Sequence, residues 1–160
     1  MALRSSQAVQ TRKLRLERKN GSWTINGNTW EKVVSSNYRH VEATPMKDSV
    51  EIWEISNQSG GWFHPTHIHL VDFKILSRNG AAPFPYEQGA KDVVYVGENE
   101  TVRLLMKFEG TGKYMIHCHN LVHEDNDMMV QFEVGTGGPD PITAAPSKPL
   151  PAPLPFPPAT

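Results

Sequence analysis

The chain of 160 residues contains a single cysteine, Cys118, and nearly equal numbers of basic and acidic side chains, 16 and 17. One cysteine cannot form an intrachain disulfide, so its thiol is buried, reactive, bound to a metal or paired with another molecule. No dense block of Lys and Arg is present, which argues against nucleic acid or an anionic membrane as a partner. There is also no run of about 18 apolar residues and no apolar segment near the N-terminus, so we expect neither a membrane span nor an export signal of its own.

The length predicts one modest domain, and the distribution of proline predicts where it ends. Residues 135–160 hold nine of the 13 prolines, a composition typical of polyproline II structure. Such a segment buries too little apolar surface to offset the entropy of ordering it. We therefore predict a Pro-rich tail over 137–160, either solvated or docked as a strap on a partner. A loose N-terminal segment is predicted over 1–12 and the folded domain over 13–136.

Between these ends the apolar residues alternate with polar ones, and no segment keeps a helical period. Asn-Gly pairs at 20–21 and 26–27 are typical of tight hairpin turns. In residues 49–56, Val50 and Ile52 share one face and the other face carries Trp53 and Ile55. The clearest alternation points four side chains of 101–108 inward: Val102, Leu104, Met106 and Phe108. The pattern predicts an all-β sandwich or barrel with at most a helical turn in a loop.

Six of the seven histidines lie in two short clusters, HPTHIH at 64–69 and HCHNLVH at 117–123. The second cluster encloses the cysteine. His40 stands alone, and we expect it to be an ordinary surface or core residue. Clustering of this kind points to a binding site built from both segments.

Strand geometry divides these residues between two faces, because successive side chains of a strand point in opposite directions. His117 and His119 share one face, and Cys118 lies on the other. His67 and His69 form a second same-face pair, which can meet the first pair if the two strands are neighbours. Four imidazoles would then converge on one side of the sheet.

The other face offers a different set of donor atoms. Cys118, His123 and Met128 follow one another at five-residue intervals, and His64 begins the upstream cluster. Two His, one Cys and a weak axial Met form the ligand set of an electron-transfer copper site. Zinc is the main alternative, although structural zinc favours several cysteines and catalytic zinc does not need a second set of paired histidines. A purely structural role is the third interpretation.

The segments HPTHIHL and HCHNLVHEDNDMM resemble the last two copper motifs of multicopper oxidases, the family that includes laccases, bilirubin oxidases and spore-coat oxidases. The resemblance covers roughly residues 13–134 and implies a C-terminal cupredoxin domain, a Greek-key β-sandwich with copper as its cofactor. By position it implies four ligands of a type 1 copper that accepts electrons from the substrate: His64, Cys118, His123 and Met128. It also implies ligands of the trinuclear cluster where dioxygen is reduced: His67 at the type 2 copper, and His69, His117 and His119 at the type 3 coppers.

The resemblance assigns a further role to the acid after the second cluster. In similar bacterial oxidases an acid directly after the type 1 histidine lies near the dioxygen path and relays protons, a role that would fall on Glu124. Dioxygen reduction consumes protons, so a carboxylate there is chemically reasonable. The alternative is a solvated or helix-capping acid. Met129 is expected to be a core residue, since the five-residue spacing selects Met128.

One part of the family pattern is absent. The trinuclear cluster of the family uses eight histidines, and the two further His-x-His motifs that supply four of them do not occur in this sequence. The chain therefore resembles a C-terminal domain whose partners would be N-terminal oxidase domains or a fragment carrying them, a small-molecule reducing substrate and dioxygen. Similar oxidases are often extracellular, periplasmic or spore-associated, which suggests such a location for the parent enzyme.

The leading hypothesis is thus a copper-binding domain of an oxidase that couples one-electron oxidation of a phenolic or similar substrate to the reduction of dioxygen to water. A second hypothesis is a non-catalytic blue-copper module that transfers electrons or holds copper. A third has copies of the chain associating, so that their paired histidines complete a cluster between subunits.

Overall fold

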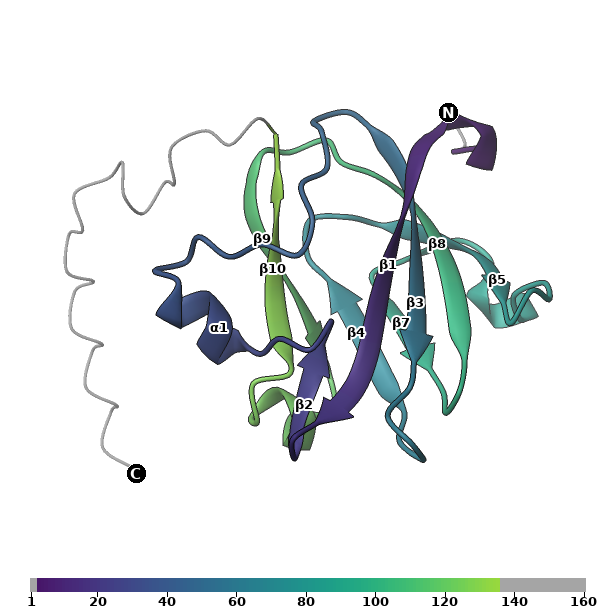
Figure 1. Cartoon of the computed structure of the whole chain (residues 1–160). Coiled ribbons are helices and arrows are strands. Elements are labelled where there is room, and N and C mark those ends of the chain that lie inside the picture. The colour runs from purple at the N-terminus through teal and green to yellow at the C-terminus, as the bar shows by residue number, and fades with distance from the viewer. Residues whose placement is uncertain (1–2, 136–160) are drawn as a thin grey trace, which may run out of the picture.

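The computed structural model describes residues 3–135 and shows two β-sheets packed against each other (Figure 1). The larger sheet has six strands, in the spatial order β2 (Ser22–Ile25), β1 (Ala8–Lys19), β3 (Val50–Asn57), β8 (Thr101–Lys107), β5 (Phe73–Arg78) and β6 (Ala90–Lys91). The smaller sheet has four, in the order β10 (Met129–Val134), β9 (Gly112–Cys118), β4 (His64–Ile68) and β7 (Val93–Val96). The all-β prediction is confirmed.

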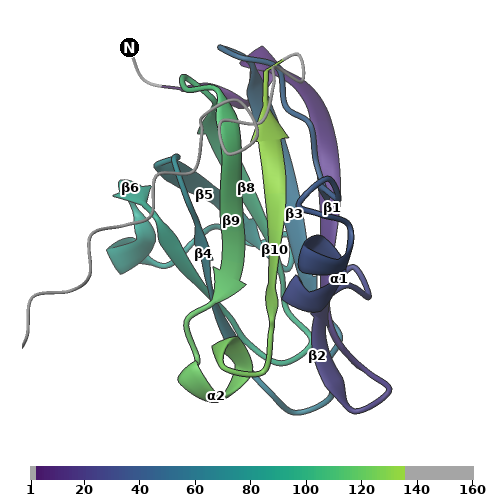
Figure 2. The ribbon, with the colours of Figure 1, turned by 90° about the vertical axis from the view of Figure 1, so that its left-hand side faces the viewer.

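Helical structure in the described residues is confined to short segments outside the strands. They are α1 (Trp30–Ser35), α2 (Leu121–Glu124) and two 3-10 turns, η1 (Ser5–Gln7) and η2 (Pro85–Glu87). Figure 2 shows α2 at one end of the sandwich, where the chain passes from β9 to β10. No helix between residues 3 and 135 is long and apolar enough to cross a membrane.

The alternation seen in the sequence accounts for the core. Val102, Leu104 and Met106 of β8 are fully buried between the sheets, with Trp53 and Ile55 of β3. The other face of β3 is covered as well. Val50 and Ile52 form a smaller apolar cluster there with Leu105, against which Leu3 and Ala8 pack. Strand β3 is therefore buried on both faces, as its nearly continuous apolar sequence suggested.

Strand β1 begins at Ala8, five residues before the start of the predicted domain. Residues 8–12 pair in parallel with β3, although polar side chains give this stretch no apolar alternation. Arg12 and Gln10 donate hydrogen bonds of 2.6–3.0 Å to the carboxylate of Glu51, which is fully buried. Backbone pairing and one buried carboxylate thus hold a segment that we expected to be loose. The predicted tail over 137–160 lies outside the described residues.

The predicted hairpin turn at Asn20-Gly21 is confirmed. Both residues have positive φ, 51° and 85°, and they connect β1 to β2. This is the backbone conformation that the Asn-Gly pair favours in a two-residue hairpin loop.

Pairing of β4 with β9 brings the two histidine clusters side by side. The strands run antiparallel, with Thr66 opposite Cys118 and His67 opposite His117. Side chains directly opposite in a ladder point to the same face. The two paired-histidine motifs therefore share one face of the smaller sheet, as the sequence predicted for neighbouring strands.

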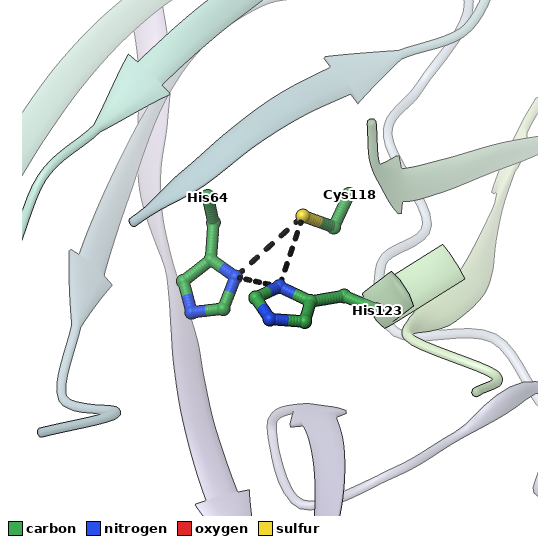
Figure 3. Close-up of side chains that lie close together, drawn as sticks. All are labelled: His64, Cys118 and His123. Carbon is green, nitrogen blue, oxygen red and sulfur yellow. Dashed lines mark hydrogen bonds between the residues drawn. The ribbon is translucent and has the colours of Figure 1, made fainter. Parts of the chain in front are cut away.

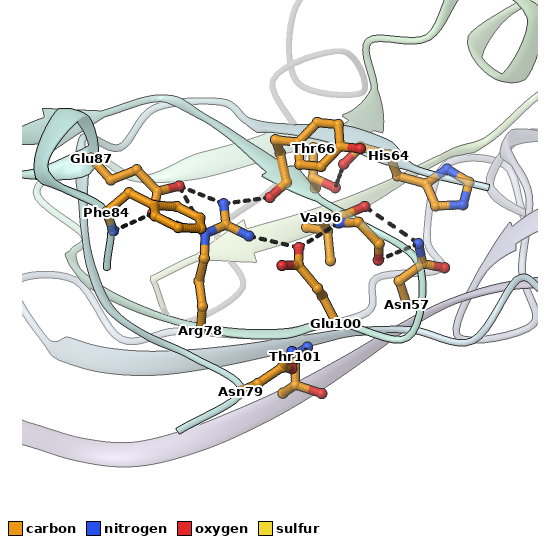
Figure 4. Close-up of polar contacts among 12 residues, drawn as sticks. Asn57, His64, Thr66, Arg78, Asn79, Phe84, Glu87, Val96, Glu100 and Thr101 are labelled. Atoms are coloured by element: carbon orange, nitrogen blue, oxygen red, sulfur yellow. Dashed lines mark hydrogen bonds and ion pairs between the residues drawn. The ribbon is translucent and has the colours of Figure 1, made fainter. Parts of the chain in front are cut away.

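A buried arginine, Arg78 at the end of β5, joins both sheets near the turn between β7 and β8 (Figure 4). The Arg78 guanidinium donates to Glu87 at 2.9 Å, to Glu100 at 2.7 Å and to the Tyr95 carbonyl at 2.6 Å. Glu100 in turn accepts the Gly97 N–H at 2.6 Å. This network fixes the turn between β7 and β8 against β5.

We expect Glu87→Gln to lower the free energy of unfolding by about 3 kcal/mol at pH 7, the low end for a broken buried ion pair, because Glu100 still faces Arg78. The hydrogen bonds from Arg78 lower the pKa of Glu87. The contribution of ionised Glu87 to the free energy of unfolding is therefore complete above the ordinary carboxyl pKa of about 4. It is lost as the pH falls through the lower pKa that Glu87 has in the folded state. Urea unfolding of both proteins between pH 7 and pH 3 measures this.

The matched control is Glu98→Gln, which alters an exposed acid in the same turn. It should change the free energy of unfolding by less than about 0.5 kcal/mol. Equal stability of the Glu87→Gln protein and the wild type at pH 7 would contradict the structural role given to this ion pair.

Candidate metal centre

The end of β9 contributes to two separate groups of side chains. Cys118 points into the core between the sheets and is 1% exposed. His117 and His119 point to the opposite face, toward His67 of β4 and His69, which directly follows β4. The division that strand alternation predicted is therefore present.

Three donor atoms meet on the core side of β9 (Figure 3). Cys118 Sγ lies 3.5 Å from His64 Nδ1 and 3.7 Å from His123 Nδ1, and the two nitrogens are 3.1 Å apart. A point equidistant from atoms at these separations lies about 2 Å from each, the length of a bond between a transition metal and nitrogen or sulfur. The group can therefore hold a small metal ion.

Each member of this group comes from a different element. His64 begins β4, Cys118 ends β9 and His123 lies on α2, with both imidazoles fully buried. Asn120 connects the last two. Its side chain caps α2 by accepting the Val122 N–H at 3.2 Å, and its own N–H donates to Cys118 Sγ at 3.4 Å. Asn120 was not predicted from the sequence, although the preference of asparagine for helix N-termini indicates a cap at this position.

Backbone hydrogen bonds hold Met128 next to this group. Its N–H donates to the His123 carbonyl at 3.0 Å, and its carbonyl accepts the Cys118 N–H at 3.2 Å. Met128 is fully buried, whereas Met129 is only partly buried at the start of β10. Met128, not Met129, is thus the methionine with a side chain enclosed beside the Cys118 and His123 backbone.

Burial sets the protonation of the core-side group. Desolvation lowers the pKa of His64 to about 4, with a smaller effect from His123, and it also lowers the pKa of His123. Both imidazoles are therefore neutral at pH 7 and have a nitrogen lone pair to offer. Burial raises the pKa of the Cys118 thiol to about 11, so this side chain keeps its proton until a cation displaces it.

Two tryptophans form the wall beyond His123. The Trp23 ring lies 4.1 Å and the Trp62 ring 5.2 Å from the His123 ring, measured between centroids. Trp62 is 44% exposed, so its indole lies between this group and the surface. Trp23 was not predicted to lie here, because it is far from the first histidine cluster in the sequence.

The second group lies on the opposite face of the smaller sheet. The ligand nitrogens of His67, His117 and His119 all fall within 4.8 Å of one another. His69 joins them through His117, with the two Nε2 atoms 3.1 Å apart. His67 Nδ1 lies 2.8 Å from the Asp92 carbonyl, which leaves its Nε2 free. All four predicted imidazoles are brought together, and His119 is exposed to solvent.

Glu124 lies beside this second group. It follows His123 on α2, and its Oε1 is 3.4 Å from His117 Nδ1. Consecutive residues of α2 therefore reach toward different groups. His40 belongs to neither group; it pairs with Glu42 at 2.8 Å, in agreement with its expected ordinary role.

Comparison with known proteins agrees with this geometry. The family model described as multicopper oxidase matches residues 5–138. The chain is 46% identical over 126 residues to a bilirubin oxidase of Albifimbria verrucaria and 43% identical over 137 residues to a laccase of Haloferax volcanii. These alignments cover 76% and 81% of this chain but only 21% and 22% of those proteins.

A solved structure shows the same likeness. The McoA multicopper oxidase of Aquifex aeolicus matches with a TM-score of 0.76 and 31% identity, over 85% of this chain and 31% of that one. The predicted cupredoxin-type fold and the resemblance on which it rested are confirmed. The chain spans about a fifth to a third of the length of these relatives.

We expect the Cys118 thiol of the metal-free, folded chain to react on the order of 100-fold more slowly with a disulfide reagent than it does in guanidinium, because burial both shields it and disfavours the thiolate. The rate of absorbance change with Ellman's reagent at pH 8 measures this. In Ser35→Cys, which adds a thiol at an exposed site on α1, a second thiol should react at the fast rate. Equal rates for the two thiols would show that Cys118 is accessible.

Proposed function

Because the chain belongs to the multicopper oxidase family, we propose that it is the copper-binding domain of an oxidase that couples one-electron oxidation of a phenolic or similar small substrate to reduction of dioxygen to water. One observation carries the proposal. His64 Nδ1, Cys118 Sγ and His123 Nδ1 lie 3.1–3.7 Å apart in the core, and four imidazoles are grouped on the opposite face of the same sheet. One group suits electron entry, and the other suits half of a multinuclear site.

Copper suits the core-side group better than zinc does. A single thiolate with two imidazoles and a weak thioether is the ligand set of a type 1 site, and Met128 would supply the thioether. Copper bound there would supply reversible one-electron chemistry. The N–H that Asn120 donates to Cys118 Sγ withdraws electron density from the sulfur and would favour the reduced state of a copper held there.

The backbone at the end of β9 is a short covalent connection between the two groups. Cys118 is bonded through single peptide units to His117 on one side and to His119 on the other. We assign these two histidines and His69 to type 3 copper, and His67 to type 2 copper. The hydrogen bond from His67 Nδ1 to the Asp92 carbonyl orients its Nε2 toward the other imidazoles.

The open face of the second group implies a partner. Four imidazoles are a partial ligand set for three coppers, and His119 is exposed. N-terminal domains of the oxidase, or a fragment that carries them, would supply the remaining ligands and enclose the cluster. Glu124, 3.4 Å from His117, is placed to hold and pass a proton at the edge of this group.

A non-catalytic copper or electron-transfer module is the second candidate. The observation that favours it is the difference between the two groups: the core-side donors all come from this chain and are buried, whereas the second group is open. Such a module would bind one copper and reduce no dioxygen. Oxygen uptake with a phenolic substrate, measured on the isolated chain and after addition of N-terminal oxidase domains, distinguishes the two candidates.

Titration of the chain with copper tests the type 1 assignment. We expect about one tightly bound copper with an intense blue colour, because thiolate-to-copper charge transfer needs the Cys118 sulfur. Cys118→Ser should remove the colour, since a hydroxyl replaces the thiolate. Metal counting and the visible spectrum together measure this. An intense blue colour in the Cys118→Ser protein would contradict the assignment.

Substitution of Met128 tests whether its thioether is a ligand. Met128→Leu should raise the reduction potential of the bound copper because it removes a weak donor, while copper stays bound. The change nearly conserves volume and should cost less than about 1.5 kcal/mol of stability. Met129→Leu is the matched control and should leave the potential unchanged. Protein-film voltammetry measures both, and equal potentials for Met128→Leu and the wild type would remove Met128 from the ligand set.

A further inference from the structure

A hydrogen-bonded chain of three buried side chains lies behind His64, on the side of the ring away from Cys118. It links Asn57 at the end of β3, Ser59 in the β3–β4 loop and His64 at the start of β4. These side chains are 2%, 7% and 0% exposed. None of the copper motifs includes Asn57 or Ser59. We infer that Ser59, held by Asn57, fixes the tautomer of His64 so that the Nδ1 lone pair faces the core-side metal group.

The orientation of the Asn57 amide is settled by its partners. The backbone N–H of Ser59 points at one end of the amide at 3.0 Å, and because a backbone N–H can only donate, that end is the carbonyl oxygen Oδ1. The other end faces backbone carbonyls, 2.6 Å from Trp62 O and 2.8 Å from Gly97 O, and so is the NH2 group. Both ends of the amide agree on one orientation.

The Ser59 hydroxyl can donate one hydrogen bond, and Asn57 accepts it. Ser59 Oγ lies 2.5 Å from Asn57 Oδ1, an atom that can only accept, so the hydroxyl donates there. Only lone pairs of Oγ are left for His64 Nε2, 2.8 Å away. The proton of the neutral imidazole must then sit on Nε2. Nδ1 carries the lone pair, and this is the nitrogen that lies 3.5 Å from Cys118 Sγ.

The second imidazole of the metal group has no such partner. His123 Nε2 is buried and, within the described residues, accepts or donates no hydrogen bond. Stacking against Trp23, at 4.1 Å between centroids, orients the His123 ring, and its Nδ1 contacts only the other two donors of the group, His64 Nδ1 at 3.1 Å and Cys118 Sγ at 3.7 Å. Ser59 therefore makes the hydrogen bond that distinguishes the two histidine ligands. It is a positioning residue that acts on the copper through His64.

The consequence for metal binding rests on the proposed function. An imidazole with its proton on Nδ1 must change tautomer before it can bind a metal through that atom. Partners that fix the ligating tautomer typically contribute 10- to 100-fold to metal affinity. We therefore expect Ser59→Ala to weaken copper binding by about 10- to 100-fold.

Two measurements on the full chain test the inference. Long-range 15N–1H correlation spectra of the metal-free wild type, labelled at histidine, should show His64 with its proton on Nε2. Anaerobic competition between the protein and a chromophoric chelator for Cu(I) should show the weaker binding by Ser59→Ala. Ser59→Thr keeps the hydroxyl and should restore the wild-type affinity. Ser56→Ala, a serine outside this network, should bind copper as the wild type does.

The outcomes separate this inference from the proposed function. A metal-free wild type with the His64 proton on Nδ1 would overturn the inference, as would wild-type copper affinity in a folded Ser59→Ala protein. Absence of copper binding by the wild type would overturn the proposed function. The tautomer measurement needs neither copper nor a variant, so it tests the inference even where Ser59→Ala does not fold.

Discussion

The alternation of side chains at the end of β9 is the constraint on which both candidate sites depend. His117, Cys118 and His119 cannot all point to one face of a strand, so the cysteine and the two histidines contribute to different groups. The β4–β9 register completes the arrangement, since it sets Thr66 against Cys118 and so places His64 on the cysteine side. A slip of one residue in β4 would exchange its faces and separate His64 from Cys118. The apolar residues Ile68 and Ile116, fully buried in the core, oppose that slip.

Burial then gives the two groups different chemistry. The core-side group shares its environment with the main apolar cluster, which keeps the imidazoles neutral and the Cys118 thiol protonated until a metal replaces the proton. A soft cation that prefers thiolate and imidazole gains most from such a site. The opposite group reaches the surface at His119, where a second protein surface can approach it. A closed group of three donors and an open group of imidazoles thus follow from the two faces of one sheet, which is the division that the proposed electron-entry site and partner half-site require.

The sequence predicted those features that local geometry controls. Alternation assigned the histidines to faces, and the five-residue spacing selected His123 and Met128, because the short helix α2 returns the chain to Cys118. It did not predict the strand at residues 8–12, where backbone pairing and the buried Glu51 replace an apolar pattern. Nor did it predict the contacts of Asn57 with Gly97 or of Trp23 with His123, since these partners are brought together only by the packing of the two sheets.

Those long-range contacts bear on how firmly each ligand is held. His64 is fixed by directional hydrogen bonds that lead through Ser59 and Asn57 to the β7–β8 turn, which the Arg78 network braces through Glu100. His123 is fixed by the shape of its aromatic surroundings and by a helix of one turn that Asn120 caps. Hydrogen bonds restrict rotation of a ring and choose its tautomer, whereas stacking leaves the tautomer free. In the proposed copper site, one rigid imidazole and one adaptable imidazole would keep the donors in place while the metal changes oxidation state, with the adjustment taken up on the α2 side.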